Sequence, residues 1–178
     1  GMMGSKEIED LLDTLAVFLQ QVVPRVGEGE SHPLLPFVGK MWPLLAALLN
    51  LFGAETRVCE SVTRVLRYCM DNLRHHLTPL LPEIVGAMVG AFRVHGSSSF
   101  LWMAKKIVKV YSRYVCWVYG ISGSGEELRG VVEQMGVVSV GIFGAAKRLD
   151  DVPDVVTDYF GLLGEFAVDC PDGVGIWS

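Results

Sequence analysis

The segment Glu55–His76 constrains the fold of this chain most, because its side chains divide between two opposite helical faces. With about 100° of rotation per residue, one face collects six apolar side chains: Val58, Val62, Val65, Leu66, Cys69 and Leu73. The opposite side carries four arginines, which we call the arginine face: Arg57, Arg64, Arg67 and Arg74. The apolar face must be buried, whereas the arginine face must stay hydrated or contact an anion. The rest of the chain offers only further helices as packing partners.

Apolar side chains recur at intervals of three and four residues along most of the chain, which is typical of amphipathic helices. Ser5 and Thr78 are expected to cap two of these helices, and Pro79 and Pro153 suit first turns. Pro43 falls inside a helix and should kink it. We therefore predict helices at 5–23, 34–52, 55–76, 78–94, 98–119, 126–149 and 153–168.

These helices form a repeating pattern of long helix, tight turn and long helix. The first helices of successive pairs begin at Leu34, Leu77 and Glu126, which are 43 and 49 residues apart. HEAT and armadillo units are about 40 to 47 residues long. We therefore predict an all-α chain, an α–α superhelix of the HEAT/armadillo-like solenoid type with about three helix pairs after an N-terminal helix. A compact helical bundle is the competing fold. The predicted units are an N-terminal helix and loop (1–33), HEAT-like repeats at 34–76, 77–120 and 121–171, and a tail (172–178).

Charge and cysteine usage exclude several classes of function. The net charge of −5 and the pI near 5.3 argue against general binding of polyanions, so no direct nucleic-acid partner is expected. The four cysteines show no CxxC pair and no disulfide-framework spacing, which favours a reducing compartment and predicts no metal site.

Enzymatic and membrane signals are also missing from the sequence. We find no GxSxG, no HExxH and no phosphate-binding loop, so we expect neither a catalytic residue nor a cofactor. The longest apolar run, Trp42–Ala54, is interrupted by Pro43 and Asn50. It is shorter than the about 20 residues that span a bilayer, so no membrane partner is expected.

Three runs of the sequence, taken in order, resemble consecutive segments of one protein family. The first is RVCE at 57–60 with RVLRY at 64–68, and the others lie within 94–111 and 153–166. They are similar to the transportin-SR branch of the importin-β family, which includes the importin-thirteen type receptors. The similarity covers roughly Leu34–Pro171.

This resemblance implies HEAT repeats, nucleocytoplasmic transport and a protein cargo bound on the concave side. It also implies that the full-length protein binds Ran GTPase and nucleoporins and is found in cytoplasm and nucleus. Because members of the family are several times longer, the chain would be a fragment from the carboxyl-terminal half of such a receptor.

The arginine face is the strongest candidate site. In the transportin-SR branch the matching helix carries arginines that contact phosphorylated arginine–serine cargo, and the residues that match are Arg57, Arg64 and Arg67. Ser61 and Asp71 stand where the family pattern has further arginines. Arginine suits phosphate because its planar fork can donate two hydrogen bonds at once. The opposing interpretation is a hydrated, self-paired face, since Glu60 and Asp71 lie three or four residues from arginines.

A second basic face is predicted on the helix at 98–119, and we call it the lysine face: Lys105, Lys106, Lys109 and Arg113, with Trp102 among them. The side opposite these cations carries the apolar stripe that this helix is predicted to bury: Phe100, Met103, Ala104, Ile107, Val108, Tyr111, Tyr114 and Val115. No acidic residue of the same helix lies between the cations. In a HEAT stack the second helices of successive units line one surface, so the two basic faces would be neighbours. The resulting hypothesis is a concave surface for acidic or phosphorylated polypeptide, with Trp102 either an exposed anchor or a packed residue.

Two other functions stay open on the sequence. One is a HEAT-repeat scaffold subunit of the phosphatase or condensin type, and the other is a stand-alone helical-bundle adaptor. Binding of a phosphorylated but not an unphosphorylated arginine–serine peptide would separate the transport receptor from both.

Overall fold

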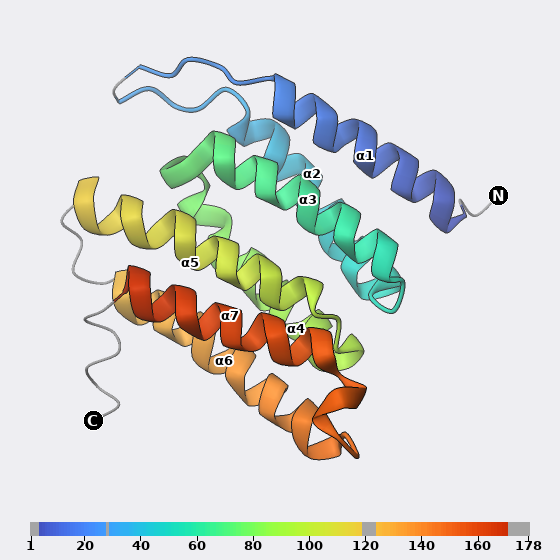
Figure 1. The fold of residues 1–178 in the computed structure, drawn as a ribbon. Helices are drawn as coiled ribbons and strands as arrows, with labels where there is room; N and C mark the ends of the chain where they lie inside the picture. Colours follow the sequence, from blue (N-terminus) through green and yellow to red (C-terminus); the bar gives the residue numbers. More distant parts are fainter. Residues whose placement is uncertain (1–3, 28, 119–123, 171–178) are drawn as a thin grey trace. The chain divides into compact units, whose positions relative to one another are not determined.

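The computed structural model describes residues 4–27, 29–118 and 124–170, with side chains at 4–27, 29–112 and 128–170. Within these ranges the chain is helical and contains no strand, which confirms the predicted all-α class (Figure 1). Its α-helices are α1 (Ser5–Gln21), α2 (Leu35–Phe52), α3 (Thr56–Leu73), α4 (Leu81–His95), α5 (Ser99–Val118), α6 (Ser124–Ala145) and α7 (Pro153–Asp169). Two 3₁₀ helices, η1 (Arg74–Leu80) and η2 (Leu149–Asp151), join some of them.

The observed helix starts fit the repeat length of HEAT and armadillo units more closely than the predicted starts do. Alternate helices begin at Leu35, Leu81 and Ser124, so successive starts are 46 and 43 residues apart. Both spacings fall within the range of HEAT and armadillo units. The α–α solenoid class therefore holds, with α1 as the helix that precedes three pairs.

The chain divides into two compact units, 1–91 and 92–178. In the first unit α3 is the central helix and packs against α1 and α2. Figure 1 shows α1 and α3 running side by side. The six residues of the predicted apolar face of α3 are all buried, as the sequence predicted: Val58, Val62, Val65, Leu66, Cys69 and Leu73. Burial of this stripe drives the packing of the unit.

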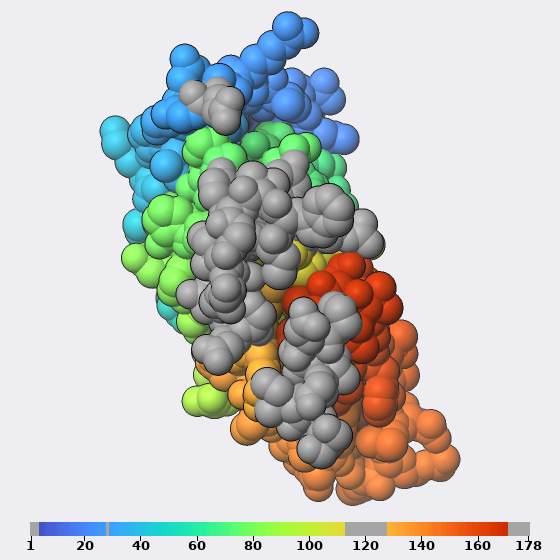
Figure 2. Space-filling view, turned by 90° about the vertical axis from the view of Figure 1, so that its left-hand side faces the viewer, coloured from blue at the N-terminus to red at the C-terminus, as the bar shows by residue number. Residues whose placement is uncertain are grey.

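In the second unit α5 is the central helix and packs against α6 and α7. The described part of its predicted apolar stripe is buried: Phe100, Met103, Ala104, Ile107, Val108 and Tyr111. The α6 and α7 helices also pack on each other, and Figure 2 shows them adjoining in orange and red. Leu162 of α7 and Met135 of α6 are fully buried and contribute to the same core.

The structure corrects the sequence prediction between 73 and 81. We predicted a helix up to His76 and a new one from about Thr78, but α3 ends at Leu73 and η1 occupies Arg74–Leu80. Arg74 has a φ of 49°, in the left-handed region that interrupts a helix. Thr78 does not cap α4, because its hydroxyl donates to the carbonyl oxygen of His75 at 2.7 Å. The chain therefore forms a short 3₁₀ helix between α3 and α4.

Smaller corrections concern two helix ends. Ser5 is the first residue of α1 and not its cap. The residue before it, Gly4, donates its backbone N–H to the carboxylate of Glu7 at 3.0 Å. The α6 helix ends at Ala145, four residues before the predicted Leu149, and Leu149 is instead the first residue of η2. Fraying and 3₁₀ turns at helix ends explain differences of this size.

The expectation that the longest apolar segment is too short to span a membrane is wrong. By length and composition alone, three stretches of the described chain are apolar enough to cross a membrane: Leu35–Phe52, Thr56–His95 and Leu128–Ala145. The first is helix α2, whose side chains Phe37, Leu44 and Leu51 are exposed at intervals of seven residues. The α2 helix is therefore apolar on more than the side that it buries within the first unit.

Candidate functional site

The apolar stripe of α3 determines where its arginines lie. Since the stripe is buried within the first unit, side chains on the other side of α3 point outward. Arg57 and Arg64 are exposed, and Arg67 is half-buried. The burial of one helical face thus presents at least two guanidinium groups to solvent.

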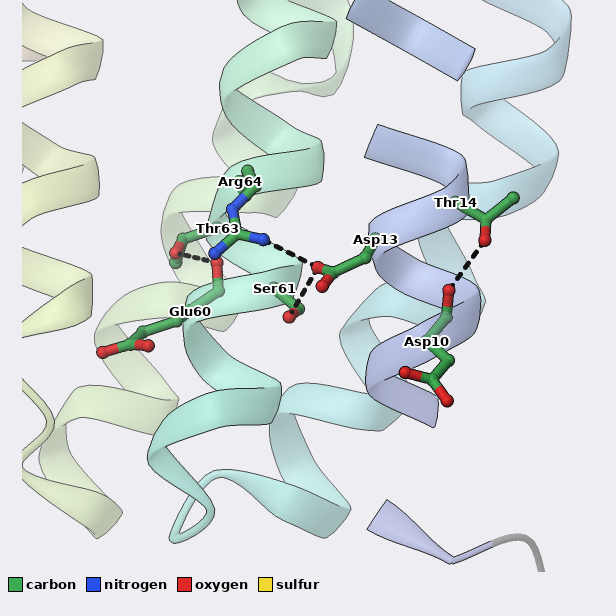
Figure 3. A network of polar contacts seen from close by, with 7 residues as sticks. All are labelled: Asp10, Asp13, Thr14, Glu60, Ser61, Thr63 and Arg64. Carbon is green, nitrogen blue, oxygen red and sulfur yellow. Dashed lines mark hydrogen bonds and ion pairs between the residues drawn. The ribbon is translucent and has the colours of Figure 1, made fainter. Parts of the chain in front are cut away.

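Asp13 of α1 holds Arg64 in an ion pair. The Oδ1 atom of Asp13 accepts hydrogen bonds from Nη1 of Arg64 at 2.7 Å and from Oγ of Ser61 at 3.1 Å (Figure 3). The Asp13 side chain is 50 % exposed and the Arg64 side chain 44 %. One carboxylate oxygen of α1 therefore contacts two consecutive turns of α3.

The partner that sequence spacing suggested for Arg64 is not the one it has. Glu60 lies four residues before Arg64, yet Figure 3 shows its carboxylate turned away from the guanidinium. Within the described part of the chain, Glu60 forms no ion pair, and neither does Arg57. Arg57 is thus an exposed cation at the start of α3 whose charge no carboxylate of the described residues neutralises.

The other two arginines differ from the prediction in their surroundings. The guanidinium carbon of Arg67 lies 4.5 Å from the centroid of the neighbouring Tyr68 ring, which is cation–π geometry. Arg74 was predicted on the same helical stripe, but it lies beyond the end of α3, in η1. The arginine face on α3 itself therefore consists of Arg57, Arg64 and Arg67.

Asn72 fixes the end of α1 against α3. Its Nδ2 atom donates to the carbonyl oxygens of Leu19 and Val22, at the C-terminal end of α1. Carbonyl groups in the last turn of a helix have no partner within the helix, so a side chain from another element satisfies them here. Together with the buried Leu12, Ala16 and Leu19 of α1, this contact holds Asp13 in place beside the arginine face.

The lysine face meets acidic side chains of α7. The Nζ atom of Lys109 lies 3.1 Å from Oε1 of Glu165. One turn away, Lys105 interacts electrostatically with Asp158. Burial raises the pKa of Asp158, while a hydrogen bond from Ser98 and the charge of Lys105 act in the opposite direction. Helix α7 thus supplies the acidic partners that α5 itself lacks.

The remaining residues of the lysine face are placed as follows. Trp102 is 37 % exposed, so it is neither a fully packed residue nor a free anchor. Lys106 is half-buried. The side chain of Arg113 lies outside the described residues. Whether the lysine face and the arginine face adjoin stays a prediction.

The first unit contains a cluster of three histidines that the sequence did not predict. His32, in the segment between α1 and α2, is only 3 % exposed, and its Nδ1 accepts the N–H of Leu34 at 3.2 Å. Its ring centroid lies 5.5 Å from that of His76, which lies 3.9 Å from that of His75. Burial, followed by the charge of His76, lowers the pKa of His32, and burial also lowers that of His75. The adjacent pair at 75–76 was visible in the sequence, but nothing there linked it to His32.

The described residues contain no group of three histidine, cysteine or acidic side chains arranged to hold a metal ion. Cys59 and Cys69 are fully buried, and burial raises their pKa to about 11 and about 12. Both thiols therefore stay protonated at neutral pH and are poor nucleophiles.

Known proteins share this sequence pattern. Residues 32–134 match the family model described as Transportin-3/Importin-13 fourth TPR domain. This range covers α2 to α5 and the first half of α6, and so includes the arginine face. The chain is also 25 % identical over 159 residues to an uncharacterized protein of Schizosaccharomyces pombe. That similarity covers 88 % of this chain but 16 % of the relative, so the chain spans about a sixth of the relative's length.

Proposed function

Because the chain belongs to the Transportin-3/Importin-13 fourth TPR domain family, we propose that it is the part of a nuclear transport receptor that binds protein cargo on the arginine face. The family match is the observation that carries this proposal, since it spans both α3 and α5. The cargo is an acidic polypeptide, with phosphorylated arginine–serine segments as its strongest class.

The geometry of α3 supports an anionic ligand. Arg57 is exposed and has no acidic partner among the described residues, and Arg64 is only partly covered by Asp13. Guanidinium groups on one exposed helical face can donate paired hydrogen bonds to phosphate oxygens. Because the net charge of the chain is −5, attraction of an acidic ligand has to come from local groups of cations such as these.

The family also suggests where the longer protein works. We propose that it moves between cytoplasm and nucleus and that its other repeats bind Ran GTPase and nucleoporins. These partners are proposals for the whole protein, of which this chain spans about a sixth judging by the yeast relative. No catalytic step is part of this function.

The test is a binding titration with a fluorescently labelled arginine–serine peptide in phosphorylated and unphosphorylated forms. Arg57→Glu and Arg64→Glu should each weaken binding of the phosphorylated peptide about tenfold or more at low salt, because each reverses one charge beside the ligand. Lys105→Glu, on the lysine face, tests whether that face also contributes. Arg93→Glu, an exposed site on α4, makes the same charge change off both faces and serves as the control.

Equal affinities of the two peptides, or equal effects of Arg57→Glu and Arg93→Glu, would contradict the cargo proposal. The scaffold and adaptor alternatives predict the first of these results. Circular dichroism of each variant checks that its helices remain folded.

A further inference from the structure

Asp13 places a negative charge where the proposed ligand would put its own. Its Oδ1 atom lies 2.7 Å from Nη1 of Arg64 and 3.1 Å from Oγ of Ser61. A ligand phosphate on Arg64 would therefore lie close to this carboxylate. The carboxylate thus occupies, from within the chain, one position of the arginine face.

The fold holds this carboxylate in place without burying it. Leu12 and Ala16, on either side of Asp13 in the sequence, are buried, and Asn72 holds the carbonyl oxygens of Leu19 and Val22 at the end of α1. Yet half of the Asp13 side chain is exposed. The carboxylate is therefore fixed by the packing of α1, while ligand and solvent can still reach Arg64.

The charge of a ligand decides how strongly such a fixed group opposes its binding. A carboxylate carries one negative charge, whereas a phosphoserine carries about −1.5 to −2 and three acceptor oxygens. A glutamate in a cargo peptide would meet Arg64 already neutralised by an equal charge. A phosphate beside Arg64 would be repelled by the fixed carboxylate more strongly than a glutamate would, because the repulsion grows with the charge of the ligand.

We propose that Asp13 is an internal acidic competitor that limits the affinity of the arginine face for anionic polypeptide. This inference rests on the proposed function and adds to it the residue that limits affinity. Asp13 acts through Arg64 and Ser61 and weakens binding of all anions, phosphates more than carboxylates because phosphates carry more charge.

The chain offers a matched control for this residue. Asp10 lies one turn earlier on α1, is also exposed, and has its carboxylate turned away from Arg64 in Figure 3. Asp13→Asn and Asp10→Asn remove the same charge from the same helix. Only Asp13→Asn removes it from the arginine face.

The experiment measures affinities of two labelled peptides, one with phosphoserine and one with glutamate at the same positions, at low salt and at about 0.15 M ionic strength. We expect Asp13→Asn to tighten binding of the phosphorylated peptide about three- to tenfold at low salt and binding of the glutamate peptide less, because the removed charge repels the phosphate more. Asp10→Asn should change both affinities equally and by less than about twofold.

Weaker binding by Asp13→Asn would overturn the inference, because it would mean that Asp13 only positions Arg64. A gain that is equal for the two peptides or larger for the glutamate peptide, or identical effects of the two asparagine variants, would do the same. If the wild-type chain and Asp13→Asn both fail to bind either peptide, the proposed function itself fails. If the wild-type chain binds the phosphorylated peptide but Asp13→Asn does not behave as expected, only the inference about Asp13 fails.

Discussion

The α1–α3 pair and the α5–α7 pair share one arrangement of apolar and charged side chains but differ in how exposed the acidic partner is. In each, a central helix buries an apolar stripe and turns a basic face toward an acidic side chain of its neighbour. In the first pair Asp13 is 50 % exposed and bonds to Arg64 and Ser61. In the second Glu165 is only 18 % exposed and pairs with Lys109.

The difference in exposure separates two roles for an ion pair. A carboxylate sheltered from water gains more from its partner than an exposed one, because solvent screens the exposed pair. The Lys109–Glu165 pair should therefore add more to the packing of α7 on α5 than the Asp13–Arg64 pair adds to that of α1 on α3. The Asp13–Arg64 pair contributes little to stability and leaves Arg64 open to exchange partners.

The largest effects should come from the two cores. Leu66 of α3 and Ile107 of α5 are both fully buried, and replacing either by alanine should lower the free energy of unfolding by about 2–5 kcal/mol through lost apolar contact and a residual cavity. Leu44→Ala, at a site 68 % exposed, should cost less than about 0.5 kcal/mol. Urea unfolding measures all three. A loss near the control value at either core site would refute the central role of that helix.

The next effect concerns the end of α1. Asn72→Ala leaves the carbonyl oxygens of Leu19 and Val22 without their side-chain donor, at a cost of about 1–3 kcal/mol. Amide hydrogen exchange should then accelerate in α1 more than in α5. Uniform acceleration in both helices would show that the contact does not act locally.

A smaller effect distinguishes the two ion pairs. Glu165→Gln should lower the free energy of unfolding by up to about 1 kcal/mol, and Asp13→Asn by less than about 0.5 kcal/mol. Added salt should reduce the difference, because it screens surface charges. Thermal unfolding of both variants at two salt concentrations measures this order, and the reverse order would contradict our interpretation of their exposure.

The smallest effect is a pH dependence in the first unit. The pKa of His32 and of His75 is lowered in the folded chain, so below about pH 6.5 the unfolded chain binds more protons and the folded state loses stability. This contribution is complete above pH 6.5 and is lost as the pH falls through the folded pKa. His32→Asn can keep an acceptor for the N–H of Leu34 without titrating, so its melting temperature should fall less between pH 7.5 and 5.5.

The comparison is made with the wild-type chain over the same pH range. If His32→Asn followed the wild-type pH curve, the buried histidine would not contribute to the pH dependence.

Most of the fold was predictable because burial imposes a regular spacing on the sequence. The apolar stripes of α3 and α5 were identified correctly, since a helix that buries one face must repeat apolar residues every three or four positions. The same spacing concealed the end of α3. Leu77 is buried four residues after Leu73, so the pattern continues across Arg74 although the backbone leaves the helix there.

The surroundings of the candidate site were less predictable because they depend on contacts between distant residues. Local spacing suggested Glu60 for Arg64, but the partner is Asp13, 51 residues away. Asp158 and Glu165 interact with lysines of α5 more than 50 residues away in the sequence, and no local spacing links them. His32 stood in a polar, glycine-containing segment and gave no sign of its burial.

The most direct test of the cargo proposal is NMR chemical-shift mapping of the chain during titration with a phosphorylated arginine–serine peptide. Our account predicts that the largest shifts fall on α3 between Arg57 and Arg67 and on α1 around Asp13. Shifts concentrated on α2 or α6, or no shifts at a peptide concentration well above that of the protein, would contradict it.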